Sequence, residues 1–150
     1  MKSIILYTTK TGNTEKVAKS ISAALKIDCL NITATSDFFE LDLDKYDMYF
    51  LGSCVYGGRP HKNIIKFLKQ FESQSKKIFV PFFTWLGRGK SDKDAFYIIK
   101  NLVINKNQIV YDSYYRCYGK SFLCIWPDHP DVKDLENAIE WASNVLQNIQ

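Results

Sequence analysis

The sequence predicts an α/β fold in which helices cover both faces of one doubly wound, five-stranded parallel sheet. Apolar, strand-like runs alternate with segments of helical spacing along the whole chain, without a linker, a repeat or a low-complexity tract. The 150 residues are 46% hydrophobic and 24% charged, which is typical of a globular chain that can bury a full core. We therefore expect one domain over residues 1–150.

The first strand and the first helix flank a polar loop. Residues 4–7 form a short run of aliphatic and aromatic side chains, which indicates a buried strand. After residues 8–14, apolar side chains return at Val17, Ile21 and Leu25, which is the spacing of one helix face. The loop therefore leads directly into the first turn of a helix.

The remaining elements continue this alternation. Strands are expected at residues 27–32, 47–52, 77–84 and from 108 as far as 117, and helices at residues 64–71, 95–102 and 131–146. The strand at 47–52 is apolar on both faces, so it belongs in the interior of the sheet. Pro81 lies inside the next strand and cannot donate to a ladder, so we expect a bulge or an early strand end there. The polar segment 33–46 holds at most one helical turn, near residues 38–41.

Composition restricts the classes of function. The net charge is +4, but the lysines are scattered, so no nucleic-acid partner is expected. No apolar run approaches the roughly 20 residues of a membrane span or the core of a signal peptide, so we expect a cytoplasmic protein without a membrane role. The four cysteines are widely spaced and form no CxxC pair, which predicts free thiols and no metal site.

The loop at residues 8–14 has the composition of a site for a terminal phosphate. A helix N-terminus presents unpaired N–H groups and partial positive charge, and a phosphate placed there satisfies both. Gly12 lets the backbone approach closely, the hydroxyls and Asn13 add neutral donors, and Lys10 adds a positive charge. The loop has neither a Walker ending nor GxGxxG. A well-capped helix start without a ligand is the alternative interpretation.

This loop resembles the phosphate loop of flavodoxins. Residues 9–15, Thr-Lys-Thr-Gly-Asn-Thr-Glu, are similar to the T/S-x-T-G-N-T-E pattern that binds the phosphate of FMN in that family. The resemblance covers nearly the whole chain and fits the short-chain form of the family. It implies a flavodoxin-like fold with strand order 2-1-3-4-5 and FMN as the cofactor. The implied phosphate site consists of Thr9, Lys10, Thr11, Gly12, Asn13 and Thr14.

The resemblance implies two further loops around the flavin ring. In the loop at 51–60, Tyr56 takes the place of the ring-packing aromatic residue, and Gly57 that of the residue whose peptide can turn toward flavin N5. In the loop after the fourth strand, Trp85 would stack on the outer face of the ring. The implied residues are Ser53, Cys54, Val55, Tyr56, Gly57, Gly58, Thr84, Trp85, Leu86, Gly87 and Gly89. A plain Gly-Gly turn and a core-filling Trp85 are the alternatives.

The predicted topology agrees with these loops. In a sheet of order 2-1-3-4-5, strand order reverses beyond strands one and three, and ligands bind at the carboxyl ends of those strands. The phosphate loop and the inner-face loop follow the same two strands. The motif and the fold therefore predict one common site.

The resemblance implies an FMN-binding electron-transfer protein that passes electrons between redox partner proteins in transient complexes. Because a flavin carries its own redox chemistry, no catalytic side chain is assigned. Flavodoxins are usually acidic, and this chain departs from them. The predicted rim of the site is positive, which favours a less reducing hydroquinone couple than is usual. Its basic residues are Arg59, His61, Lys62, Arg88 and Lys90.

Two alternatives remain open. One is a flavodoxin-like FMN oxidoreductase that acts directly on a small organic substrate of the quinone or porphyrinogen type, with residues 118–126 lining a substrate cleft. The other is an interaction domain that has kept the fold and lost the flavin. A phosphate-signalling receiver domain shares the topology, but it requires an acidic cluster at the end of the first strand, where this chain has threonines.

Overall fold

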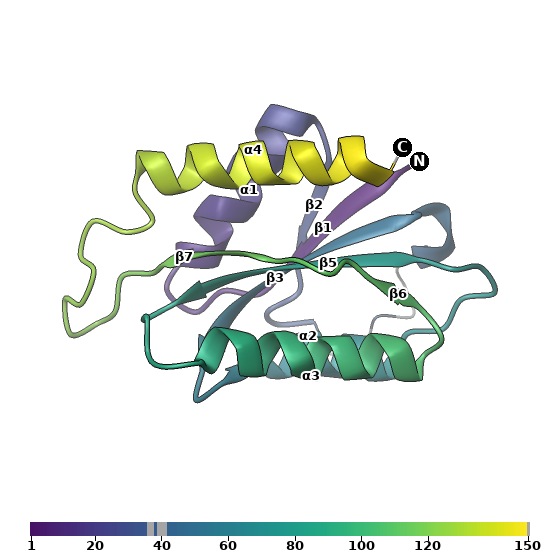
Figure 1. The fold of residues 1–150 in the computed structure, drawn as a ribbon, viewed down its shortest axis with the longest axis horizontal. Coiled ribbons are helices and arrows are strands. Elements are labelled where there is room, and N and C mark those ends of the chain that lie inside the picture. The colour runs from purple at the N-terminus through teal and green to yellow at the C-terminus, as the bar shows by residue number, and fades with distance from the viewer. Residues whose placement is uncertain (36–37, 39–41, 150) are drawn as a thin grey trace.

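A computed structural model of the chain describes residues 1–35, 38 and 42–149. Strands and helices alternate from the N-terminus to the C-terminus (Figure 1). The elements are β1 (Ser3–Tyr7), α1 (Asn13–Leu25), β2 (Asp28–Asn31), the 3-10 helix η1 (Leu43–Lys45), β3 (Met48–Tyr56), β4 (Arg59–Pro60), α2 (Lys62–Gln70), β5 (Ile78–Trp85), α3 (Ser91–Asn105), β6 (Ile109–Val110), β7 (Tyr115–Tyr118) and α4 (Val132–Ile149). Most of the helical turn expected near residues 38–41 lies outside the described residues.

The strands form one sheet in the order β2-β1-β3-β5-β6, and all neighbours along this path are parallel. β7 also pairs with β5 in parallel, and the short β4 pairs with β3 in the antiparallel direction. Helices α1 and α4 cover one face, and α2 and α3 cover the other (Figure 1). The predicted doubly wound fold and its strand order are confirmed. No helix within the described ranges is long and apolar enough to span a bilayer.

The two faces of the sheet have different cores. The side facing α2 and α3 is rich in aromatic rings, with Tyr49 stacked on Phe79 at 5.1 Å between centroids. The side facing α1 and α4 packs smaller residues, among them Val17, Ala138 and Ala142. Each fully buried Val, Leu or Phe side chain stabilises the fold by about 1.5–3 kcal/mol. Both helix layers are therefore attached firmly to the sheet that positions the loops.

The bulge or early strand end predicted at Pro81 is wrong. β5 continues through Pro81, which pairs with Leu51 of β3. On the side away from β3, the Phe79 carbonyl accepts a hydrogen bond from the Tyr111 N–H at 2.8 Å. The backbone of Pro81 faces that same side, because successive strand residues alternate in the neighbour that they bond. There it meets residues 111–114, which belong to no strand, so the missing N–H leaves no ladder bond unmade.

The fifth predicted strand is divided into β6 and β7. Phe79 of β5 pairs with Val110 of β6, and Phe82 of β5 pairs with Tyr115 of β7. Between these two pairings β5 advances by three residues, whereas the chain from β6 to β7 advances by five. The extra residues leave the ladder between the two pairings. As a result β7 extends to the carboxyl end of β5, beside the loops at that edge.

Candidate functional site

The loops that follow β1, β3, β5 and β7 meet at the carboxyl edge of the sheet, at left in Figure 1. They enclose a cavity of about 70 Å³, which we call the carboxyl-edge pocket. Open α/β sheets bind their ligands at this position. The site predicted from the loop sequences and the topology therefore corresponds to a real hollow in the structure.

Most of the predicted cofactor residues line this pocket. The first loop and the start of α1 contribute Thr9, Lys10, Thr11, Asn13 and Thr14, the end of β3 contributes Cys54, Val55 and Tyr56, and the end of β5 with the next residue contributes Thr84, Trp85 and Leu86. The strands β3 and β5 thus extend into the segments predicted as the second and third loops. Three segments far apart in sequence thus share one cavity. The remaining wall consists of residues 119–122, for which the sequence predicted no FMN contact.

The other predicted residues lie around the pocket. Ser53 is fully buried, and its hydroxyl accepts a hydrogen bond from the His61 N–H at 2.8 Å. Positive φ values, which glycine adopts without strain, occur at Gly12, Gly57, Gly58, Gly87 and Gly89. The two glycines after Tyr56 line an adjoining hollow of about 360 Å³, which shares Tyr56 and Leu86 with the pocket.

The N-terminus of α1 opens toward the first loop without a side-chain cap. Gly12 occupies the N-cap position at φ 85°, and the residues that the structure describes provide no side-chain cap. The Gly12 N–H donates instead to the Thr9 hydroxyl at 2.9 Å, which closes the loop on itself. A Cβ built on Gly12 would meet nothing within 4 Å. Unpaired helix N–H groups beside open space form a cradle that suits an anion.

Side chains from two other loops hold the first loop in place. The Thr9 N–H donates to the Thr33 hydroxyl at 2.9 Å, and that hydroxyl lies 3.3 Å from the Thr9 carbonyl oxygen. The Asn63 amide in turn donates to the carbonyls of Ile32 and Thr33, at 2.9 and 2.7 Å. Sequence reasoning missed Thr33 and Asn63, because neither belongs to a recognisable motif.

A second polar contact ties α1 to β5. The Thr14 and Thr84 hydroxyls lie 2.8 Å apart, and both residues are buried. Such a hydrogen bond contributes about 0.5–1.5 kcal/mol to the stability of the fold. Removing one partner destabilises the protein by more than this, because the other hydroxyl is then buried without a hydrogen bond. It therefore fixes the first helical turn against the strand that leads to the third loop.

Tyr56 presents an open aromatic face at the mouth of the pocket. Its side chain is 47% exposed, although it lies between buried residues of β3 and two glycines. The Lys10 ammonium nitrogen lies 4.6 Å from the ring centroid, a cation–π distance. The ring is therefore accessible to a flat or positively charged group.

Trp85 is engaged with protein side chains. It is 8% exposed and belongs to the core on the α2–α3 face. The Arg116 guanidinium carbon lies 4.7 Å from the Trp85 ring centroid, and the Tyr118 ring stacks at 6.3 Å. This packing favours the core-filling interpretation of Trp85, while its edge still reaches the pocket wall.

Asp92 anchors Arg116 in that position. Its carboxylate is 1% exposed, forms an ion pair with Arg116 and accepts a hydrogen bond from the Tyr114 hydroxyl at 2.7 Å. Burial by itself would raise the pKa of Asp92, but these two partners hold it below its usual value. The pair therefore joins the first turn of α3 to β7, directly beside the pocket.

Residues 118–130 include the wall at 119–122, which sequence reasoning connected only with the substrate cleft of the oxidoreductase alternative. The Asn13 side-chain amide donates to the Lys120 carbonyl at 2.8 Å, and a Cβ on Gly119 would lie 2.7 Å from that amide nitrogen. The Tyr118 and Trp126 rings stack at 4.0 Å between centroids, with an interplanar angle of 1°. The segment is thus packed onto itself and onto α1. Its aromatic content was visible in the sequence, but these contacts were not.

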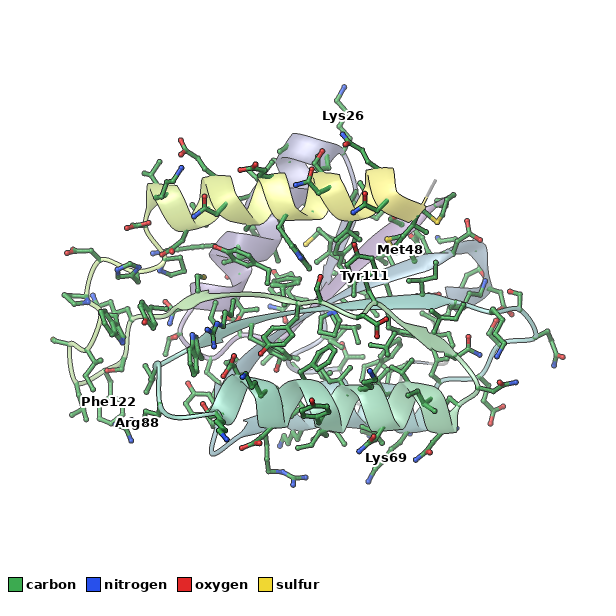
Figure 2. All side chains as sticks on the ribbon, in the orientation of Figure 1. Lys26, Met48, Lys69, Arg88, Tyr111 and Phe122 are labelled. Atoms are coloured by element: carbon green, nitrogen blue, oxygen red, sulfur yellow. The ribbon has the colours of Figure 1, made fainter. Side chains whose placement is uncertain are left out.

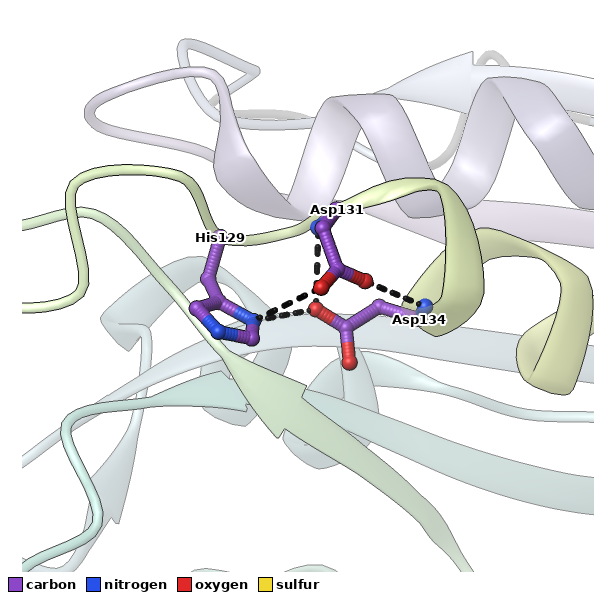
Figure 3. Close-up of side chains that lie close together, drawn as sticks. All are labelled: His129, Asp131 and Asp134. Carbon is purple, nitrogen blue, oxygen red and sulfur yellow. Dashed lines mark hydrogen bonds and ion pairs between the residues drawn. The ribbon is translucent and has the colours of Figure 1, made fainter.

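The end of this segment caps α4 (Figure 3). The Asp131 carboxylate accepts from the Asp134 N–H at 2.8 Å, and the Asp134 carboxylate accepts from the Asp131 N–H at 2.9 Å. This reciprocal pair has the pattern of a capping box. Asp134 also lies 2.6 Å from His129 Nδ1, and this contact raises the pKa of His129.

Cys54 and His61 are not activated for catalysis. Burial raises the pKa of the Cys54 thiol, so it is protonated at neutral pH. Burial lowers the pKa of His61, and the positive charges of Lys10 and Lys62 lower it further. The His61 Nδ1 accepts a hydrogen bond from the Asn63 N–H at 3.1 Å and thereby caps α2. All four cysteines are free thiols, as predicted.

Residues 4–122 match the family model of the flavodoxin domain. The chain belongs to the flavodoxin domain family. It is 32% identical to the uncharacterized protein MJ0298 of Methanocaldococcus jannaschii, over 99% of this chain and all of the archaeal one. Oxidised flavodoxin 1 from Bacillus cereus has a similar structure, with a TM-score of 0.75 and 15% identity over 98% of both chains. A flavoprotein from Lactobacillus acidophilus NCFM, solved in complex with FMN, gives a TM-score of 0.61 and 22% identity over 77% of this chain and 92% of its own.

Family membership supports the predicted cofactor, and the residues of this flavodoxin domain fit it. The uncapped start of α1, with Lys10 and Lys120 nearby, suits a phosphate dianion. The open face of Tyr56 suits a flat ring. The pocket alone is smaller than the roughly 300–1,000 Å³ that is usual for ligand sites. Together with the adjoining hollow, which shares Tyr56 and Leu86, it provides room at both ends of the cofactor.

Proposed function

We propose that this flavodoxin domain binds FMN and carries single electrons between redox partner proteins. The observation that carries the proposal is the meeting of two features in one cavity. An uncapped helix N-terminus lined by hydroxyls lies at one side, and an accessible aromatic face lies at the other. An elongated ligand with an anionic end and a flat ring matches both features.

Each part of the site has a defined task in this proposal. The N–H groups and hydroxyls of residues 9–14 bind the phosphate, and Lys10 and Lys120 balance its charge. Tyr56 packs against the ring, and Gly57 leaves the adjacent peptide free to turn. Bound FMN supplies the redox chemistry, so the protein contributes binding, orientation and electrostatics. The site therefore needs no acidic or basic catalytic side chain.

One observation favours a second candidate, a flavodoxin-like oxidoreductase that reduces a small organic substrate directly. Residues 119–122 form a wall of the pocket, and the Phe122 side chain is 88% exposed at its mouth. A flat quinone or tetrapyrrole would find an apolar contact there. The two candidates differ in turnover: a carrier exchanges electrons with redox proteins, whereas an oxidoreductase cycles with a small donor and a small acceptor.

Binding of FMN is tested with riboflavin as the reference ligand. We expect FMN to bind with measurable heat, and Thr11→Glu to weaken FMN at least tenfold while changing riboflavin affinity little, because the new carboxylate repels only the phosphate. Thr11→Gln is the matched control and should stay close to the unchanged protein. Because Thr11 is exposed, neither substitution disturbs the packing of the core. The absence of FMN binding, or equal losses for both ligands, contradicts the proposal.

The carrier role is tested with the FMN-loaded protein. After anaerobic reduction it should reduce cytochrome c stoichiometrically, and it should show no sustained NADH- or NADPH-dependent reduction of menadione. Sustained turnover of the quinone with either nucleotide would favour the oxidoreductase instead.

A further inference from the structure

The loops at the carboxyl edge concentrate positive charge. Residues 8–14, 53–63, 84–91 and 117–127 contain six of the 20 Lys and Arg residues and none of the 16 Asp and Glu residues. All six side chains are exposed, and within the described part of the chain none of them forms an ion pair. They are Lys10, Arg59, Lys62, Arg88, Lys90 and Lys120.

The remaining sequence carries a net formal charge of −2, because its 14 basic residues face 16 acidic ones. The positive charge of the protein is therefore a property of this one edge. Of the carboxylates nearest to it, Asp92 is paired with Arg116 and Glu15 with Lys19, whereas Asp94 lines the adjoining hollow and Asp128 is exposed. The six cations outnumber these two carboxylates, so an approaching molecule meets a predominantly positive field.

Exposed apolar side chains lie in the same loops. Tyr56 is 47% exposed, Phe122 is 88% exposed and Leu123 is 64% exposed. Figure 2 shows Phe122 and Arg88 at the same end of the molecule. An apolar centre with a charged rim is the usual anatomy of a protein–protein interface. We call these three residues and the six basic ones the edge surface.

We propose that the edge surface docks a redox protein whose contact face is acidic. This inference rests on the proposed function, because electrons must leave or enter beside Tyr56. The charge complementarity speeds encounter and selects against basic partners. The apolar centre excludes water between the two proteins, which brings the partner close to the pocket that holds the cofactor.

A nucleic acid fits the edge surface less well than a protein does. Strand binding uses aromatic faces on which bases can stack, within a groove of positive charge. Here the Tyr118 and Trp126 rings are stacked on each other, and the Tyr56 face is directed at the cofactor pocket. Phe122 and Leu123 are neighbours in one exposed turn, Phe122 lines the pocket together with Lys10 and Lys120, and Arg88 lies at the same end of the molecule (Figure 2). This combination suits a shallow acidic protein face.

The test follows electron transfer in the FMN-loaded protein by stopped-flow absorbance. The donor is an acidic reduced 2[4Fe-4S] ferredoxin, and the comparison partner is basic cytochrome c, which accepts electrons from the reduced protein. Between about 20 and 300 mM NaCl we expect the ferredoxin rate constant to fall by roughly tenfold, because salt screens the attraction. The cytochrome c rate constant should stay constant or rise.

Charge-reversed variants locate the effect. Arg59→Glu with Lys62→Glu, at two exposed positions that line neither the pocket nor the adjoining hollow, should lower the low-salt ferredoxin rate by roughly tenfold and raise the cytochrome c rate. The matched control, Lys26→Glu with Lys69→Glu, changes the net charge equally at sites away from this edge (Figure 2) and should have a much smaller effect. Phe122→Ser with Leu123→Ser should slow the ferredoxin reaction at high salt as well.

The outcomes separate this inference from the proposed function. A protein that takes up no FMN refutes the carrier role itself. A protein that binds FMN and exchanges electrons, but with rates insensitive to salt or equally affected by the control pair, retains the carrier role and overturns the acidic-partner inference. Binding of labelled oligo(dT) or of anionic phosphatidylserine vesicles at 150 mM NaCl also overturns the inference if Arg59→Glu with Lys62→Glu abolishes that binding and leaves the ferredoxin rates unchanged.

Discussion

At the residue scale, the candidate phosphate loop depends on side chains that lie outside it. Thr33 contacts both the N–H and the carbonyl of Thr9, and the Asn63 amide fixes the backbone around Thr33. An anion site made of backbone N–H groups works only if those groups are aimed before the ligand arrives, because reorienting them costs free energy. We therefore propose that Thr33 positions the candidate phosphate loop for its ligand.

This role predicts a selective loss. Thr33→Val removes the hydroxyl at nearly constant volume and leaves the Thr9 N–H unpaired, which we expect to weaken FMN binding about tenfold, or about 1.4 kcal/mol. Riboflavin affinity should change less than twofold, since its ring contacts are elsewhere. Fluorescence titration with both flavins measures the difference. Thr35→Val makes the same chemical change two residues farther along and should leave the affinity for both flavins unchanged. If Thr33→Val weakened FMN and riboflavin equally, the substitution would have caused a general structural defect instead.

At the scale of elements, residues 118–130 connect the pocket wall to the start of α4. The Lys120 N–H donates to the His129 carbonyl at 2.9 Å, and the His129 ring packs edge-on against Tyr118 and Trp126. The same residue contacts Asp134 of the α4 capping box. The wall of the pocket is thereby held at both of its ends by backbone and side-chain contacts of one histidine.

The His129 contact predicts a pH-dependent stability. Asp134 holds the pKa of His129 above its usual value of about 6.5, and Asp131 and Asp128 add to this. The stabilisation is fully present below the unfolded pKa and is lost as the pH rises through the higher, folded pKa. His129→Gln should therefore cost more stability at pH 5.5 than at pH 9, by less than about 1 kcal/mol because the pair is partly exposed.

Urea unfolding of both proteins at the two pH values measures this difference. Asp134→Asn in the presence of His129 should remove the same pH dependence, although it also weakens the helix cap. A cost of His129→Gln that is equal at both pH values would contradict the assignment.

At the scale of the whole molecule, the charge is unevenly divided between the carboxyl edge and the rest. Six cations lie in the four segments at the carboxyl edge, while the remaining sequence has a formal charge of −2. A positive charge about 8 Å from a reduced, anionic flavin stabilises it by roughly 2 kcal/mol at an effective dielectric of about 20. For a one-electron step this corresponds to about 90 mV, and solvent screening reduces the value at an exposed rim.

The edge charges should therefore raise the potential at which bound FMN takes its second electron. Arg88→Gln and Lys120→Gln are each expected to lower that potential by tens of millivolts, up to about 90 mV. Lys69→Gln, which removes an equal charge from α2 far from the pocket, should leave it unchanged. An anaerobic reductive titration of the FMN-loaded proteins gives the potentials. Equal potentials in all four proteins would show that the edge charges are too well screened to act on the flavin.

The elements and the main site loops could be predicted because their signals are local. A strand of β-branched residues, a helix face repeating every three to four residues and a hydroxyl-rich loop each lie within one short stretch. The prediction at Pro81 failed for the opposite reason. Whether a proline is tolerated in a strand depends on what its neighbouring strand does there, and the interruption between β6 and β7 lies about thirty residues away in sequence.

The sequence by itself determined the parallel α/β order, the position of the candidate phosphate loop and the family, because periodicity and a contiguous motif carry that information. Only the tertiary structure decided that Thr33 and Asn63 hold the loop, that Trp85 is covered by Arg116 and Tyr118, and that residues 119–122 close the pocket. These are contacts between segments that become neighbours only when the sheet is assembled. Their strength depends on distance and burial in space, which no single stretch of sequence encodes.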